Sequence, residues 1–418
     1  MSTQMRTQPA PQIRLNIVDR FVSFFNPEAG MARAKARHLL SIRRHEAAGR
    51  GRRHPAENDL SGTINSDIDA ELDILRRRSQ NMIGNNGYAG QALNVIANGI
   101  VGIGIKPSVV TESKELEAML LKEWAAWGNR HACDWNGRET FHGIQQQIIR
   151  AVFSSGEAIV RRRRTSDGIG LQLQVHEGDY LDSSMSSMIA TSDGYTQNGI
   201  EYNADGKVVA YWLFDSLETY TPANTLTSRR IPASEIIHVF YADRAGQQRG
   251  LPWLRRSYMK LKDVNRYEDA EMLGKIASAC HAAFISGGVE GIAGLPVVAS
   301  DAQRIDRIEP GMVTYLQPNE TVTFNTPPHH GGYTEFMASQ LRSTAAGVGT
   351  SYEAMTGDYS QVNFSSGRMG WIEAGRNYAE KRERTMIYPL NRVWEWFMEA
   401  MQITGKFGGT LEDARNIH

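Results

Sequence analysis

The feature that most constrains this chain is a helix, a long polar loop and a longer helix between about Tyr333 and Met401. Apolar residues in the first part recur at intervals of three, four and seven, which predicts an amphipathic helix. They are Tyr333, Phe336, Met337, Leu341, Ala345 and Val348. Glycine accepts the left-handed backbone that closes a helix, so Gly347 and Gly349 mark its end.

A second helical pattern begins at Gly367. The residues on its successive turns are Met369, Ile372, Arg376, Ala379 and Glu383. Pro389 lacks a backbone N–H donor, so it is expected to bend or split the helix. A last segment has an apolar stripe of Val393, Trp394, Phe397 and Met401. At about 1.5 Å per residue, the stretch from Gly367 to Tyr388 extends roughly 30 Å, which is long enough to line an opening.

The loop between these helices runs from about Thr350 to Ser366, and its only charged residues are Glu353 and Asp358. It is rich in glycine, serine, asparagine, glutamine and tyrosine. Because it is longer than a typical connection between helices, we expect it to be functional. The alternative is a surface hairpin of two helices that packs on its own domain.

The charge balance excludes a strongly basic protein built to grip DNA, because 46 Lys and Arg residues face 46 Asp and Glu residues. Any contact with nucleic acid is therefore expected to be local or weak. The only cysteines, Cys133 and Cys280, lie far apart without a metal-binding pattern, which fits a reducing compartment. The sequence shows no apolar run of membrane-spanning length and no signal-peptide pattern, so we expect a soluble protein made inside the cell.

The remaining segments are arranged around the helix–loop–helix stretch. Residues 1–58 form a basic arm that either binds nucleic acid or an acidic surface, or is a partly disordered tail. Amphipathic helices are expected between about Ser66 and Gly156, followed by period-two segments that predict a mostly antiparallel sheet. A second long helix follows Pro252, and a compact segment with strand-like patterns leads from it to Tyr333.

The usual catalytic motifs are missing from the sequence. There is no GxxxxGK[ST] phosphate loop, no HExxH, no GxSxG and no paired Cys/His spacing. Glu157 and Asp179 lack a third acidic residue for a nuclease metal centre, and the His329–His330 pair lies in a Pro/Gly loop where adjacent side chains diverge. Arg161–Arg164 could form a phosphate patch, but side chains alternate along a strand, which favours a solvated strand end. We therefore expect no catalytic residues, cofactor or metal.

Three long runs, in this order and spacing, are similar to the lambda-type portal proteins of tailed bacteriophages. They are RSQNMIGNNGYAGQALNVIANGIVGIGIKP, IIHVFYADRAGQQRGLPWL and LRSTAAGVGTSYEAMTGDYSQVNFSSGRMG. A fourth run, FHGIQQQIIRAVFSSGEAIV, lies between the first two and supports them. The resemblance covers roughly residues 60 to 400.

The resemblance implies an α+β portal fold and a dodecameric ring whose channel carries double-stranded DNA during packaging and ejection. Its parts are a basic N-terminal arm (1–58), a wing of helices plus a mostly antiparallel sheet (59–249), a stem helix (250–280), a small clip (281–330), a second stem helix (331–349), a tunnel loop (350–366), a long return helix of wing to crown (367–403) and a short C-terminal tail (404–418). We expect a short tail because portals of this type usually continue well past the position of His418.

The resemblance also implies partners and a location. The partners are further copies of the chain, double-stranded DNA, the terminase large subunit, a head-completion or adaptor protein and the major capsid protein, with no membrane. The location is the portal vertex of the virion, after assembly in the host cytoplasm. The alternatives are a DNA-processing enzyme such as a nuclease of a mobile element, and another ring-forming neck or capsid protein.

Two groups of residues are expected to carry this function. The tunnel-loop residues facing DNA are Gly357, Asp358, Tyr359, Ser360, Gln361 and Asn363. Polar groups of this kind exchange hydrogen bonds with phosphate or water at nearly equal energy. DNA therefore passes without a deep free-energy minimum at any position. The stem residues expected to pack against neighbouring copies are Tyr258, Leu261, Tyr267, Phe336 and Leu341.

Overall fold

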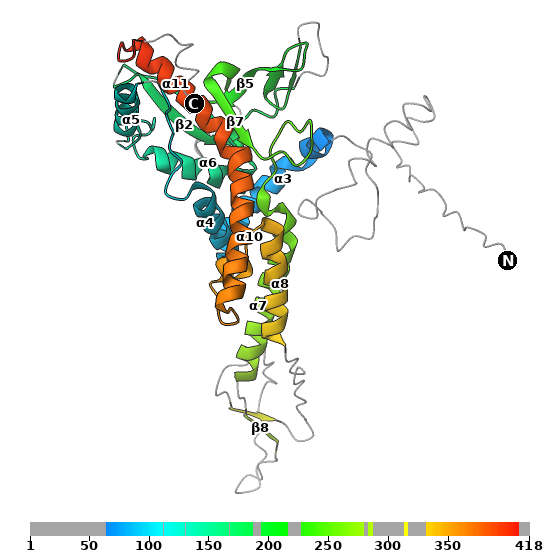
Figure 1. Cartoon of the computed structure of the whole chain (residues 1–418). Coiled ribbons are helices and arrows are strands. Elements are labelled where there is room, and N and C mark those ends of the chain that lie inside the picture. The colour runs from blue at the N-terminus through cyan, green and yellow to red at the C-terminus, as the bar shows by residue number, and fades with distance from the viewer. Residues whose placement is uncertain are drawn as a thin grey trace, which may run out of the picture. The chain divides into compact units, whose positions relative to one another are not determined.

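The computed structural model describes residues 64–111, 113–129, 131–166, 168–186, 194–215, 227–279, 283–286, 313–316 and 332–408 (Figure 1). Its contacts divide the chain into two compact units. One comprises Met1–Met259 together with Ser343–His418, and the other comprises Lys260–Arg342. The predicted basic arm, residues 1–58, lies outside the described residues, as does His329–His330.

The described part of the first unit begins with four helices, as the amphipathic patterns predict. They are α3 (Ile64–Asn85), α4 (Gly87–Val101), α5 (Lys114–Gly128) and α6 (Phe141–Ser155). Helices α3, α4 and α6 pack against one another. Side chains that accept a backbone N–H start three of the helices: Asn86 accepts from Ala89 at 2.8 Å, and Ser113 and Thr140 play the same part at α5 and α6.

The strands of this unit form two antiparallel sheets, where the sequence predicted one. The first has the order β2-β1-β7, with β1 (Glu157–Arg164), β2 (Leu171–Glu177) and β7 (Ile236–Phe240). The second has the order β3-β4-β5-β6, with β3 (Tyr195–Gln197), β4 (Ile200–Tyr202), β5 (Val208–Phe214) and β6 (Ser228–Pro232). Ile159 and Ile236 from the first sheet share a core with Tyr211 and Leu213 from the second. The split therefore lets both sheets cover one apolar cluster.

The arginines of β1 point alternately to the two faces of the first sheet, as expected for a strand. Arg162 is buried and forms an ion pair with Glu399 at 2.7 Å. Arg163 places its guanidinium 4.2 Å from the ring centre of Trp135. Arg162 therefore anchors the C-terminal helix α11 (Tyr388–Ile403), which packs against β7 and β2 (Figure 1).

A buried charge cluster joins helix α3 to the first sheet. Glu157 is 0% exposed and accepts hydrogen bonds from Arg76, Arg249, His238 and the backbone N–H of Gly250. Burial alone would raise the pKa of the Glu157 carboxyl, but Arg249 and Arg76 hold that pKa well below its usual range. The cluster is fully paired, which is what a buried carboxylate requires to remain charged.

The second unit contains most of helix α7 (Tyr258–Ala279) and the first part of α8 (Tyr333–Val348). Tyr267 on α7 contacts Tyr333 and Phe336 on α8, with ring centres 5.8 Å and 4.6 Å apart. A parallel pair of strands, β8 (Ala283–Ser286) and β9 (Val313–Leu316), also belongs to this unit. β9 falls in a predicted strand, IEPGMVTYLQ, whereas the second one, ETVTFNT, lies outside the described residues.

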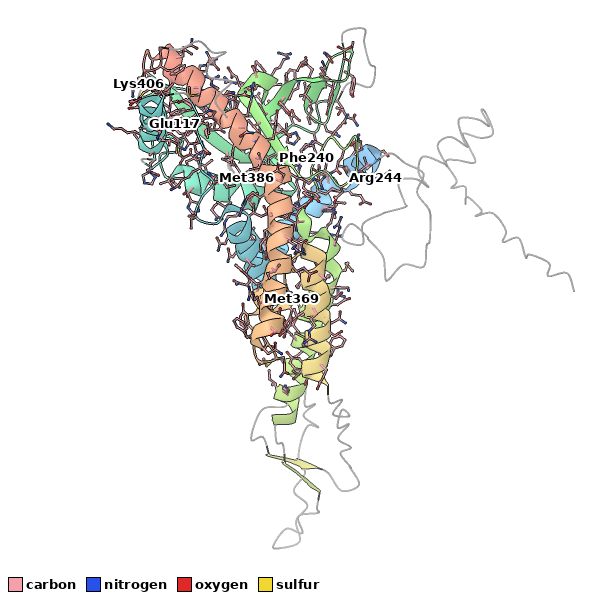
Figure 2. The ribbon with its side chains drawn as sticks, viewed as in Figure 1. Glu117, Phe240, Arg244, Met369, Met386 and Lys406 are labelled. Carbon is pink, nitrogen blue, oxygen red and sulfur yellow. The ribbon has the colours of Figure 1, made fainter. Side chains whose placement is uncertain are left out.

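Residues 364–403 form a long interrupted helix. Helix α10 (Phe364–Arg382) passes into a π-helical turn, η6 (Glu383–Ile387), and then into α11. The predicted interruption at Pro389 is thus present as a π-turn just before it, where the helical hydrogen-bond pattern shifts. Met386 in this turn is 0% exposed, whereas Met369 on α10 is 71% exposed (Figure 2). With these helices and two small antiparallel sheets, the predicted α+β class is confirmed.

Candidate functional site

The stretch predicted as one loop from Thr350 to Ser366 contains a short helix, α9 (Tyr352–Thr356). Ser351 starts it by accepting a hydrogen bond from the N–H of Ala354 at 3.2 Å. Gly357 ends it with a φ of 73°, a left-handed conformation that glycine adopts without strain. Met355 is 1% exposed, so its side chain anchors α9 in the core. The open loop is therefore shorter than predicted and runs from Gly357 to Asn363.

Two of the predicted tunnel-loop side chains form hydrogen bonds with residues of the adjoining helices α9 and α10. Asp358 accepts hydrogen bonds from the Tyr352 hydroxyl at 2.9 Å and from the Ser360 N–H at 3.0 Å. Asn363 starts α10 through a capping box, in which its side chain accepts from the N–H of Ser366 at 2.8 Å. These bonds fix the shape of the loop.

The remaining predicted residues of this loop face outward. Tyr359 is 61% exposed, and Gly357, Ser360 and Gln361 are also exposed. Ser360 and Gln361 have polar side chains without charge, and Asp358 is the one acidic residue between Gly357 and Asn363. The loop therefore presents a polar, nearly neutral tip held on two helices.

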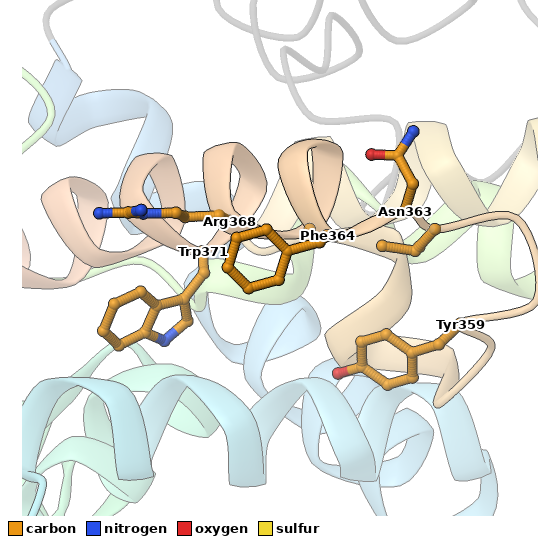
Figure 3. A pocket seen from close by; sticks show the side chains of 7 residues that line it. Tyr359, Asn363, Phe364, Arg368 and Trp371 are labelled. Atoms are coloured by element: carbon orange, nitrogen blue, oxygen red, sulfur yellow. The ribbon is translucent and has the colours of Figure 1, made fainter.

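An open hollow of about 550 Å³ lies beside this tip. Its lining residues are Tyr359, Val362, Asn363, Phe364, Gly367, Arg368 and Trp371. Figure 3 shows Phe364, Arg368 and Trp371 projecting from α10, and Tyr359 from the loop that precedes it. Phe364 is 84% exposed and Trp371 is 78% exposed. The sequence analysis did not single out Phe364, Arg368 and Trp371. Their spacing of four and then three residues was a signal that they share a helix face.

The predicted stem residues divide into buried and exposed ones. Leu261 is 0% exposed and Leu341 is 4% exposed in the single chain. Tyr258 is half-buried, and the Cζ atom of the Arg78 guanidinium lies 6.0 Å from the centre of its ring. Tyr267 and Phe336 pack on each other, and Phe336 remains 42% exposed. The proposal that all five contact a neighbouring copy stays a prediction.

Helix α7 also has exposed apolar side chains that are not among the predicted stem residues. Met272, Leu273 and Ile276 are 61%, 66% and 52% exposed. Two of them, Met272 and Ile276, continue the helical spacing of apolar residues that includes Leu261 and Val264 on α7. The pattern could not tell which members lie inside the chain and which on its surface.

Within the described residues, no group of three or more His, Cys, Asp or Glu side chains is placed to hold a metal ion. Glu157, considered for a nuclease centre, has both oxygens occupied by Arg249 and its other partners and is fully buried. Asp179 lies 3.9 Å from Arg76 and accepts from Gln80 at 2.9 Å. The Glu157 carboxylate is thus a structural ion-pair partner.

None of the described helices combines the length and apolar character of a membrane-spanning segment.

Comparison with known proteins finds portal proteins. The family described as phage portal protein, lambda family, matches residues 50–382. The probable portal protein of Halomonas phage phiHAP-1 is 25% identical over 365 residues, covering 82% of this chain and 69% of the relative. Portal protein B of Escherichia phage lambda is 22% identical over 367 residues, covering 78% of this chain and 68% of the relative.

The portal protein of Escherichia phage N15 is also 22% identical, and this chain covers 65% of its length. Among solved structures, the neck of a native gene transfer agent particle, computed with C12 symmetry, matches with a TM-score of 0.44 and 15% identity. That match covers 78% of this chain and 81% of the other.

Proposed function

Because the chain belongs to the lambda family of phage portal proteins, we propose that its copies form a ring around a channel for double-stranded DNA at one capsid vertex. The observation that carries the proposal is the exposed polar loop from Gly357 to Asn363, held between α9 and α10. A ring of such loops narrows a channel without gripping its contents. We propose twelve copies in the ring.

The chemistry of the loop suits passage of DNA. Each Lys or Arg that neutralises a phosphate adds salt-dependent affinity, and a ring multiplies the number of such contacts by the number of copies. The loop from Gly357 to Asn363 has no such cation. Ser360 and Gln361 can exchange hydrogen bonds between phosphate and water at little net cost. The Asp358 carboxylate, held by Tyr352, would repel phosphate and discourage a stationary contact.

The remaining parts of the chain are assigned by the same proposal. We propose residues 59–249 as the wing, 250–280 and 331–349 as the stem and 281–330 as the clip. We propose 350–366 as the stretch that contains the tunnel loop, from Gly357 to Asn363, and 367–403 as the return helix. The clip would meet the terminase large subunit and later the head-completion protein, and the wing would face the major capsid protein. Assembly would take place in the host cytoplasm.

The proposed role is structural and not enzymatic. The family is a portal family, and the carboxylate considered for a nuclease, Glu157, is buried among arginines. If the chain were a nuclease, Glu157→Gln would abolish metal-dependent cleavage of DNA. We expect no cleavage by the unmodified protein with Mg²⁺ or Mn²⁺ in the first place.

The test of the channel loop is Gln361→Lys, which places one cation per copy on the loop. Such a ring of cations should hold phosphate, so packaging should slow at low ionic strength and recover partly as salt rises. The measurement is the rate of DNA packaging into proheads across a salt series. The matched control is Asn129→Lys, which adds the same charge at the exposed end of α5.

The two variants must both assemble for the comparison to count, which light scattering checks. The proposal predicts that Asn129→Lys packages like the unmodified protein at every salt concentration. A packaging rate of Gln361→Lys that equals that of its control across the whole series would show that the loop does not line the channel.

A further inference from the structure

Helix α10 carries an aromatic face that is exposed to solvent in the single chain. Phe364, Arg368 and Trp371 are spaced by four and then three residues, so they lie on one side of the helix. Phe364 is 84% exposed and Trp371 is 78% exposed. Among the described residues, none forms an ion pair or hydrogen bond with the Arg368 side chain. Aromatic side chains with an arginine between them have the composition of an interface hot spot. We call these three residues the α10 face.

Helix α7 carries a second exposed apolar face of different chemistry. Asp269, Met272, Leu273 and Ile276 follow the spacing that places side chains on one side of a helix. Met272 and Leu273 are 61% and 66% exposed, and Asp269 is exposed as well. No ion pair joins Asp269 to another of the described residues. We call these four residues the α7 face.

The two faces complement each other. The α10 face combines two large aromatic side chains with one charge, the cation of Arg368, and the α7 face combines three apolar side chains with the Asp269 carboxylate. The exposed Arg266 lies three residues before Asp269, at the edge of the α7 face. Two α10 faces brought together would place two Arg368 guanidinium groups in the same contact. Like charges in a desolvated contact are unfavourable. A contact between unlike faces pairs the charges instead.

We infer that the α10 face of one copy of this chain binds the α7 face of a second copy, with Arg368 paired to Asp269. Such a contact uses two different surfaces of one chain, so it repeats from copy to copy and closes into a ring when the rotation permits. The inference rests on the proposed ring and names the surfaces that hold neighbouring copies together. Trp371 and Phe364 then lose their exposure to water among Met272, Leu273 and Ile276.

The charge pair allows a test by exchange. Arg368→Asp and Asp269→Arg should each raise the protein concentration at which rings half-form by about tenfold, because each places like charges in the contact. The double variant, which carries both changes, restores an opposite-charge pair and should return assembly to near that of the unmodified protein. Arg138→Asp, an exposed charge reversal on the connection before α6, is the control and should assemble normally.

Assembly is measured by light scattering over a dilution series, and circular dichroism confirms that each variant is folded. Rescue in the double variant supports the contact, because two unrelated defects would add instead. If both single variants weaken rings and the double variant is weaker still, or if the single variants assemble like the control, the contact is wrong while the ring proposal stands. If the unmodified protein forms no ring, both proposals fail.

Discussion

The two halves of α10 differ in what they do with the same kind of side chain. Phe364, Trp371 and Tyr378 recur every seven residues and therefore lie along one side of the helix. Tyr378 packs on α4 where Gly99 leaves room for its ring, and its hydroxyl is 2.8 Å from the Thr350 hydroxyl. Phe364 and Trp371 stay 84% and 78% exposed.

The neighbouring element therefore decides the role of each aromatic residue. Arg382, one turn beyond Tyr378, donates to the carbonyl oxygens of Gly99 and Ile100 and so fixes this half of α10 to α4. Among the described residues, no hydrogen bond of this kind fixes the first turns of α10 to α4. One half of the helix therefore belongs to the core of the chain, and we propose that the other half is completed by a second copy.

Tyr378→Ala should have the largest effect on stability. It removes a ring that packs against Gly99 and a hydroxyl that is hydrogen-bonded to Thr350, so the free energy of unfolding should fall by about 2 kcal/mol. Chemical denaturation of the dissociated protein measures this change.

The matched control is Trp371→Ala, one heptad earlier on the same side of α10. Because that side chain is exposed, the free energy of unfolding of the dissociated protein should change by no more than about 0.5 kcal/mol. Equal losses in the two variants would show that the halves of α10 do not differ as described.

Gly99→Ala should have a smaller effect of the same kind. A Cβ at this position would overlap the ring of Tyr378. Alanine is the better helix former by about 1 kcal/mol, but overpacking a fixed ring costs about 1–3 kcal/mol, so we expect a net loss of about 1 kcal/mol.

Gly90→Ala in the same helix provides the comparison, because its Cβ would make only an ordinary contact, 3.5 Å from the Ile83 carbonyl oxygen. It should raise the free energy of unfolding by up to about 1 kcal/mol. If Gly99→Ala also stabilises the protein, the ring of Tyr378 moves freely and does not fix α10 to α4.

Much of the local structure could be predicted from the sequence, because strong periodic patterns and glycine or proline breaks decide it. The helices on both sides of the loop, the apolar stripe of α11 and the interruption near Pro389 are examples. The short helix α9 was missed because a serine cap and a closing glycine, Ser351 and Gly357, surround only five residues. The division into two sheets depends on which strands pair, and pairing is not visible in the period of a strand.

The sequence did not separate the apolar faces that the chain itself covers from those that it leaves exposed. The turns of α10 marked by Met369, Ile372, Arg376 and Ala379 are exposed, while Ala374 on another side is buried. Apolar periodicity predicts that a helix face is buried. It does not distinguish burial within the same chain from burial against another chain. For the same reason the sequence predicted a contact between copies for Leu261, which is fully buried in the single chain, and not for Trp371, which is 78% exposed.

We propose above all that copies of this chain form a ring with an open channel. Two-dimensional class averages of the purified protein by electron microscopy test it most directly. We expect end-on views with a central hole and radial repeats of a single kind. Uniform monomers at high protein concentration would contradict it.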